Sequence, residues 1–138
     1  MKAWATLLGG CMVVLWAGSV CADGSALQAT AHCAHPPSPG RVLCEVNAKA
    51  SSGRLVWSDV LVVRAPAFAR PLRSRVVAVL GTSQEAATAK LALVAGQVGQ
   101  GKLELLMRGV ICKEANAAEA CQTVTQALSA PLEVGPLP

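Results

Sequence analysis

Thiol chemistry is the first possibility that this sequence offers, because six cysteines occur in 138 residues. Two of them lie in an apolar N-terminal stretch. The other four form two closely spaced pairs, Cys33 with Cys44 and Cys112 with Cys121. An even number of cysteines at short spacing is typical of a disulfide framework in an exported protein. We therefore expect all four to be in disulfide bonds.

The N-terminal stretch has the pattern of an export signal. Lys2 precedes a mostly apolar segment over residues 7–20, and small or branched residues lead up to Ala22. This pattern predicts a signal peptide over residues 1–22 and a periplasmic or secreted protein. A membrane anchor is the competing interpretation, but the apolar segment is shorter than the roughly 20 residues that span a bilayer. We expect no transmembrane segment after leader removal. Lipidation at Cys11 or Cys21 is a minor alternative.

Four cysteines allow three connectivities. An immunoglobulin-like domain would join Cys44 to Cys112, and Trp57, thirteen residues after Cys44, invites that comparison. Strand alternation speaks against it, because Cys44 is in phase with the apolar residues of its segment and Cys112 with the charged ones. A bond through the core would require a β-bulge that turns Cys112 around.

Local pairing requires only that two short loops fold back on themselves. Residues 36–40 contain three prolines and a glycine, which supply the first return. The loop-entropy estimate gives about 2.7 kcal/mol for each local bridge and roughly 4.4 kcal/mol for Cys44 with Cys112, so energy excludes neither. Geometry favours Cys33–Cys44 and Cys112–Cys121, which is our prediction.

The second cysteine pair carries a resemblance. Residues 101–134 contain a strand, Cys112, a short loop, Cys121 and another strand. This segment resembles the N-terminal periplasmic domain of the bacterial transmembrane thiol:disulfide interchange reductase. The resemblance implies an immunoglobulin-like sandwich in which Cys112 and Cys121 are the exchanging pair. Exchange needs an accessible thiolate of lowered pKa, which Lys113 would favour and Glu114 and Glu119 would oppose. We expect a structural disulfide, with thiol-disulfide exchange as the alternative.

Other reactive side chains are sparse. His32 and His35 flank Cys33 and could begin a soft-metal site, but a cysteine in a disulfide cannot bind a metal. We therefore expect no metal and no cofactor, with the two histidines as weak candidates. Asp59 lies between Trp57 and Leu61 on one strand face, which a bulge or an edge position explains more simply than catalysis. We expect no catalytic residue.

Composition limits the partners. Residues 23–138 suit a single domain, and their net charge of about +3 is too small to indicate nucleic-acid binding. Four arginines between residues 64 and 75 have one phenylalanine near them, which favours a solvated loop over a phosphate site. The scarcity of aromatic residues argues against a lectin or an adhesive groove.

The remaining pattern is one of short strands. Apolar alternation predicts strands at 41–50, 75–80, 102–111 and 122–128, with a central strand at 55–63 and a final piece after Pro131. Residues 51–53 predict a hairpin turn, and residues 64–71 predict a loop or an edge crossing. Residues 83–95 are ambiguous: a strand from about Lys90 is favoured, and a short helix is the alternative. The sum is an all-β, immunoglobulin-like β-sandwich of about seven short strands.

These observations favour a non-enzymatic function. We expect an exported β-sandwich that acts as an interaction or accessory module of a bacterial cell envelope. Its partner would be another envelope or secreted protein. The alternative is a periplasmic thiol-disulfide exchange domain that uses Cys112 and Cys121.

Overall fold

The computed structural model describes residues 26–115 and 118–137, so the predicted leader over residues 1–22, with Cys11 and Cys21, lies outside the described residues. The described part of the chain contains nine strands and no helix. The strands are β1 (Leu27–Cys33), β2 (Gly40–Ala50), β3 (Arg54–Arg64), β4 (Ala69–Pro71), β5 (Arg75–Val77), β6 (Val79–Leu80), β7 (Ala86–Ala95), β8 (Gly99–Ala115) and β9 (Ala118–Val134).

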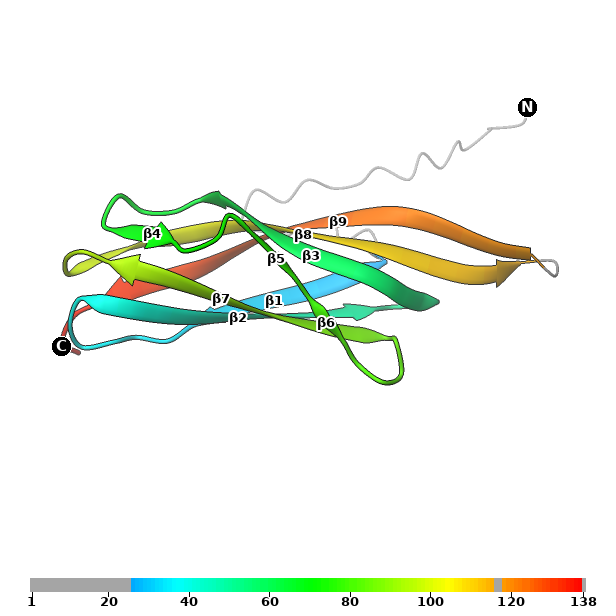
Figure 1. Cartoon of the computed structure of the whole chain (residues 1–138), viewed down its shortest axis with the longest axis horizontal. Helices are drawn as coiled ribbons and strands as arrows, with labels where there is room; N and C mark the ends of the chain where they lie inside the picture. Colours follow the sequence, from blue (N-terminus) through cyan, green and yellow to red (C-terminus); the bar gives the residue numbers. More distant parts are fainter. Residues whose placement is uncertain (1–25, 116–117, 138) are drawn as a thin grey trace, which may run out of the picture.

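The strands form two antiparallel sheets that pack face to face (Figure 1). One sheet has the order β1-β2-β7-β4, with β6 also paired to β7, and the other has the order β5-β3-β8-β9. If β1, β2, β3, β5, β7, β8 and β9 are lettered A, B, C, C′, E, F and G, this is the immunoglobulin arrangement. The predicted all-β, immunoglobulin-like sandwich is therefore confirmed, with nine strands in place of about seven, and two of them, β8 and β9, are long, with 17 residues each.

The core lies between the sheets and is almost entirely aliphatic. Strand β2 alternates buried and exposed residues along its length, as predicted, because successive side chains of a strand point to opposite faces. Trp57 lies outside the core, and Phe68 is only partly buried against it. The largest fully buried apolar side chains are Leu27, Val42, Val46, Leu55, Val60, Leu93, Leu103, Leu105, Met107, Ile111 and Leu132.

The turn at residues 51–53 is not a hairpin, which corrects the prediction. Strands β2 and β3 belong to different sheets, so residues 51–53 carry the chain across the end of the sandwich. Gly53 does have the expected positive φ, at 84°. A Cβ there would lie 2.9 Å from the carbonyl oxygen of Cys112. The glycine thus marks a tight crossing rather than strand pairing, a distinction that a turn residue alone does not make.

Residues 86–95 form strand β7, so the strand interpretation of this ambiguous segment is confirmed and the helical alternative is wrong. The strand begins at Ala86 rather than near Lys90. Its residues alternate between the core and the outer face, and β7 is central in its sheet. Here the packing of small alternating side chains between two sheets outweighs the helix propensity of alanine.

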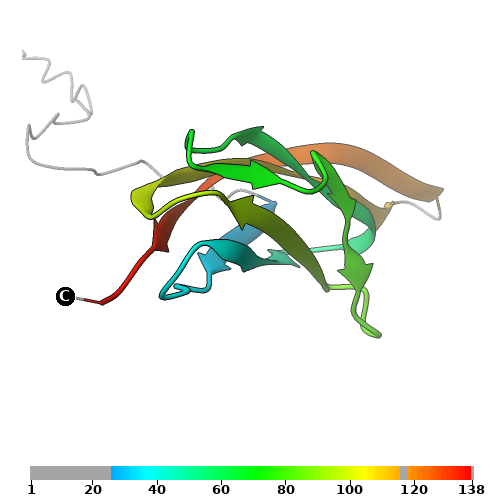
Figure 2. The same cartoon turned by 60° about the vertical axis from the view of Figure 1, so that its left-hand side comes forward.

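Residues 75–80 form two strands rather than one. Strand β5 pairs with β3 in one sheet and β6 pairs with β7 in the other, so the chain changes sheets at Ala78 (Figure 2). Residues 64–71, which we expected to be free of strand, contain the three residues of β4. Pro131 does not interrupt β9, because β9 is an edge strand and a proline can face its unpaired side.

Candidate functional site

Both disulfides join residues that lie directly opposite each other on neighbouring strands. Cys33 on β1 pairs with Cys44 on β2, with a Cα–Cα distance of 3.9 Å. Cys112 on β8 pairs with Cys121 on β9, with a Cα–Cα distance of 4.0 Å. This is the local connectivity. Such short Cα–Cα distances mark the non-hydrogen-bonded pairs of an antiparallel ladder.

Strand parity explains why Cys44 and Cys112 are not joined to each other. Cys44 faces the core and is 3% exposed, in step with Val42 and Val46. Cys112 lies out of step with the inward-facing Ile111 and belongs to the outer face of β8. A bond between them would have to pass through β8 itself. The immunoglobulin arrangement is thus present without the disulfide that usually joins its two sheets.

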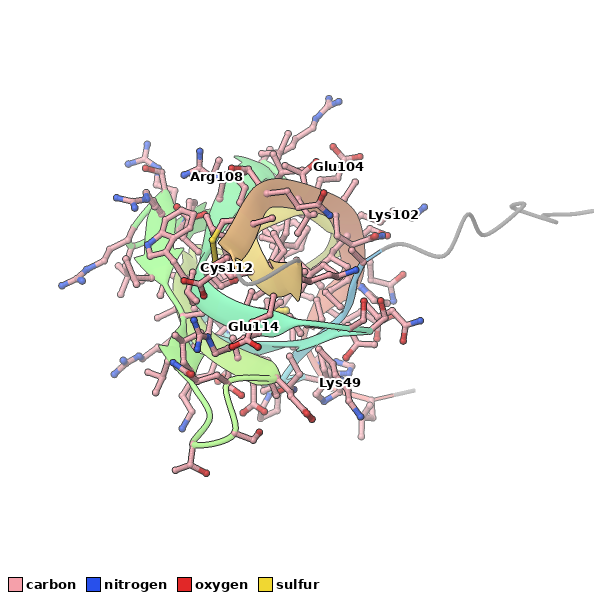
Figure 3. The ribbon with its side chains drawn as sticks, turned by 90° about the vertical axis from the view of Figure 1, so that its right-hand side faces the viewer. Lys49, Lys102, Glu104, Arg108, Cys112 and Glu114 are labelled. Atoms are coloured by element: carbon pink, nitrogen blue, oxygen red, sulfur yellow. A yellow bond between two sulfur atoms is a disulfide. The ribbon has the colours of Figure 1, made fainter. Side chains whose placement is uncertain are left out.

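The Cys112–Cys121 disulfide lies near the free end of the β8–β9 hairpin (Figure 3). Cys112 is 6% exposed, whereas Cys121 is exposed. Arg54 and Glu119 form an ion pair beside it. Glu119 also brings a carboxylate oxygen within 4.8 Å of both sulfur atoms, but sulfurs that are bonded to each other do not supply a thiolate set for a metal.

Asp59 is on the outer face of the second sheet, and a bulge puts it there. The register of β3 against β8 shifts between Leu55 and Trp57, so Val56 is the additional residue. The shift turns Trp57 and Asp59 outward, while Val60 returns to the core. Of the two explanations that the sequence left open for Asp59, a bulge or an edge position, the register shows the bulge, since β3 lies between β5 and β8.

Asp59 is fully buried although it lies on an outer face, because two arginines cover it. The Nε atom of Arg75 donates to Oδ2 at 2.6 Å, and the Nε atom of Arg108 donates to Oδ1 at 2.8 Å. Nη2 of Arg108 also donates to Oδ2. The two guanidinium groups lie 5.8 and 5.6 Å from the ring centroid of Trp57. We call Trp57, Asp59, Arg75 and Arg108 the arginine cluster.

The arginine cluster keeps its carboxylate ionised. The hydrogen bond from Arg108 lowers the pKa of Asp59 below its ordinary value, and the bond from Arg75 adds to this, against the opposing effect of burial. Both oxygens of the carboxylate accept from arginine, so Asp59 is committed to structure and is not poised to transfer protons. Sequence reasoning identified Asp59 and Trp57 but missed both arginines, since their positions depend on strand pairing.

The two histidines that were candidate metal ligands, His32 and His35, make different contacts. Nε2 of His35 donates to the carbonyl oxygen of Gly135 at 2.9 Å, and its Nδ1 lies 3.4 Å from a carboxylate oxygen of Glu133. His35 thereby fastens the end of β9 to the loop after β1. His32 faces outward on β1, opposite Glu45. Within residues 26–115 and 118–137, neither histidine joins a group of three potential metal ligands.

Among the described residues, no helix is long and apolar enough to span a membrane.

No protein-family model and no curated protein matches the chain. Two solved structures from Escherichia coli are similar in outline. AggA, the major subunit of aggregative adherence fimbriae type I, is 12% identical, with a TM-score of 0.40, and the match covers 78% of this chain and 95% of AggA.

The second structure comes from the AAF fimbriae of enteroaggregative Escherichia coli and was described together with fibronectin binding and biofilm formation. It is 10% identical, with a TM-score of 0.29, and the match covers 75% of this chain and 98% of that one. At these scores we base no inference about function on either likeness. The β-sandwich itself follows from the strand order of this chain.

Proposed function

We propose that this chain is an exported, non-enzymatic interaction or accessory module of the bacterial cell envelope. Two disulfides support an extracytoplasmic location, because cytosolic reductants keep such cysteines reduced. Several side chains that could take part in a reaction are instead engaged in structural contacts. Four cysteines form disulfides, Asp59 binds two arginines and His35 binds the end of β9. The partner would be another envelope or secreted protein.

The long, uncharged edge of strand β9 is the observation that best supports this proposal. Strand β9 is a 17-residue edge strand, and in the part of the chain that is described it has a strand partner only on its β8 side. Residues 120–132 contain no charged side chain. On the other flank the outer strands β4, β5 and β6 have only three, three and two residues. Long uncharged edges are templates for strand pairing, which proteins otherwise prevent with short or charged edge strands.

The register identifies the groups that would bind. Because Cys112 and Cys121 form a non-hydrogen-bonded pair, the odd-numbered residues of β9 direct their backbone groups away from β8. The side chains of Thr123, Thr125, Ala127 and Ser129 are exposed. A partner strand that adds to this edge would gain main-chain hydrogen bonds and contact these small side chains.

Site-specific photocrosslinking in the envelope of a bacterium that expresses the full chain tests the proposal. A benzophenone amino acid at Ala127 should give a discrete adduct with one envelope protein. The same probe at Lys49, which is exposed on the other sheet, should not. Adding Thr125→Pro should abolish the adduct, because it removes an edge-facing N–H and leaves the β8 ladder intact, as Pro131 already does. An adduct that survives Thr125→Pro would contradict pairing at this edge.

Thiol-disulfide exchange is a second candidate, favoured by the unequal exposure of Cys112 and Cys121. Because Cys121 is an exposed residue and Cys112 a buried one, an incoming thiolate would reach the disulfide from the Cys121 side. The sulfur of Cys121 would form the mixed disulfide, and the thiolate of Cys112 would be the leaving group. This is the exchanging pair that the reductase resemblance implies.

Equilibration in glutathione buffers, followed by alkylation and mass spectrometry, tests this candidate. A redox pair should be half reduced within the potential range of the glutathione couple, while Cys33–Cys44 stays oxidised. A Cys112–Cys121 bond that resists these buffers, and whose removal only lowers the melting temperature, is structural.

A further inference from the structure

The edge of β7 opposite β2 has a gap in the middle. Strand β4 pairs with Leu93 to Ala95 and β6 pairs with Ala87 and Thr88. Between them the chain leaves this sheet so that β5 can pair with β3. Within the described part of the chain, residues 89–92 of β7 therefore have no strand paired with them on this edge.

Backbone hydrogen bonds show which groups face the gap. The carbonyl oxygens of Ala86 and Ala92 accept from Gly81 and Leu72 across this same edge, at 2.8 and 2.9 Å. Backbone groups alternate in direction along a strand, so the even-numbered residues of β7 face this edge. Lys90 therefore directs its N–H and C=O into the gap, where neither β4 nor β6 reaches.

A groove lies over this gap. Its floor is the outward-facing row of β7, formed by Thr88, Lys90 and Ala92, and its wall is the chain from Leu72 to Val79. Two adjoining hollows of about 500 and 330 Å³ share Val76 and Lys90. The first is walled by Val76, Val77 and Val79, and the second by Arg41, Leu72 and Arg73.

The groove is positively charged as well as apolar. Arg41, Arg73 and Lys90 line it, and none of the described residues that line it carries a carboxylate. The ion pairs of the described residues involve other basic groups. Glu45, the register partner of Lys90 on β2, accepts instead from the side-chain amide of Asn47 at 3.1 Å. The occupant that complements this groove is thus anionic and partly apolar.

We propose that the groove binds an extended peptide segment in which acidic side chains alternate with apolar ones. The backbone of the peptide would pair with the N–H and C=O of Lys90 and so fill the gap between β4 and β6. Its apolar side chains would pack on Val76, Val77 and Val79, and its carboxylates would meet Arg73 and Lys90. Bidentate arginine–carboxylate contacts add direction to the charge attraction.

The free backbone pair favours a peptide over a lipid headgroup or free phosphate, since neither of those reproduces the amide pattern of a strand. The groove is a second surface of the proposed module, on the flank away from β9. It does not depend on strand pairing at β9, and failure of either proposal leaves the other standing.

Fluorescence anisotropy with the disulfide-bonded protein provides the first test. The probe is a fluorescein-labelled octapeptide that alternates valine with glutamate. We expect saturable binding, and Arg73→Gln with Lys90→Gln should weaken it at least tenfold. Lys49→Gln, on the same outer face but outside the groove, should leave it unchanged. No saturation up to about 1 mM peptide, or equal binding by the double variant, would overturn the proposal.

Two further measurements separate a peptide groove from a merely basic patch. Hydrogen exchange followed by NMR should show the Lys90 amide protected on peptide binding, whereas side-chain attraction alone would leave its exchange rate unchanged and so refute the backbone pairing. A peptide that alternates valine with lysine should not bind. Displacement of the acidic peptide by millimolar inorganic phosphate would show a phosphate site and count against the proposal. Thr125→Pro on β9 should bind the peptide as the unaltered protein does.

Discussion

The two disulfides of this domain join the same kind of strand pair yet lie in opposite environments. They close loops of similar length, with sequence separations of 11 and 9, and their Cα–Cα distances differ by about 0.1 Å. Cys33 and Cys44 are 9% and 3% exposed and face the core, whereas Cys121 is exposed on the outer face of β9. Because the two loops are similar in length, loop entropy should stabilise the fold almost equally in the two cases. The two disulfides differ in their surroundings: Cys33–Cys44 packs in the core, whereas Cys112–Cys121 is accessible to thiols.

Strand parity produces this difference. The apolar face of β2 contains Cys44, so its disulfide fills volume between the sheets, in a core to which the described residues contribute no fully buried aromatic ring. The outer face of β8 contains Cys112, four residues after Arg108 of the arginine cluster. One disulfide thus belongs to the packing of the core and the other to a face that is ordered by charge.

Removing the inward disulfide should have the largest effect on stability. Cys33→Ala with Cys44→Ala loses about 2.7 kcal/mol of loop-entropy stabilisation and about 1–2 kcal/mol more for the cavity left in the core. We expect the free energy of unfolding, measured with urea, to fall by about 4 kcal/mol in total. A loss no greater than that of the other disulfide would show that packing around Cys44 contributes nothing.

Removing the outward disulfide should cost less. Cys112→Ala with Cys121→Ala loses about 2.7 kcal/mol of loop-entropy stabilisation but leaves no enclosed cavity. The same urea titration should place this variant between the unaltered protein and the Cys33, Cys44 variant. If the β8–β9 hairpin stays closed in the unfolded chain, the disulfide restricts that chain little, and its removal should hardly change the free energy of unfolding. The two disulfides would then differ in loop entropy as well.

Asp59→Asn tests whether charge orders the outer face. The substitution keeps the shape of the side chain but leaves the arginines facing a neutral amide. Breaking one member of a buried ion pair commonly costs 3–5 kcal/mol, and access of the arginines to water reduces this to about 2 kcal/mol. Glu45→Gln, an exposed acid on the other sheet, is the control and should change little. A loss as small as that of the control would mean that the arginine cluster adds no stability.

Acid titration should show the same interaction through its pH dependence. The pKa of Asp59 is lowered below 3.8 in the folded state, so the unfolded chain takes up the proton first as the pH falls. The stabilisation from Asp59 is therefore complete above about pH 5 and is lost as the pH falls below 4 through the lowered value. Melting temperatures of the protein and of Asp59→Asn should converge over this range. Parallel curves would show that Asp59 is not the titrating group.

The sequence predicted those features that depend on a single strand. Alternation along β2 gave the inward position of Cys44, and the same rule put Cys112 on an outer face. Features that depend on which strands are neighbours were missed. Residues 51–53 were mistaken for a hairpin because a turn glycine reports backbone conformation and not the sheet to which the next strand belongs.

The candidate sites show the same limit. Asp59 was recognised as unusual from its neighbours on β3, but Arg75 and Arg108 come from β5 and β8, and only the register brings them together. The groove on β7 depends on the chain changing sheets at Ala78, and the sequence showed only a continuous β-branched run there. Non-local pairing is the information that periodicity does not contain.

The ion pair between Arg54 and Glu119 should have the smallest effect. Both side chains are 49% exposed and lie beside the outward disulfide. Ion pairs this open to water contribute little, because solvent screens them and ordering two long side chains costs entropy. Arg54→Gln should lower the free energy of unfolding by less than about 0.5 kcal/mol at low salt and by even less at high salt. If the free energy of unfolding falls as much as in Asp59→Asn, the charge of Arg54 stabilises the hairpin end together with the covalent bond. The two disulfides would then differ in their supporting contacts as well as in their burial.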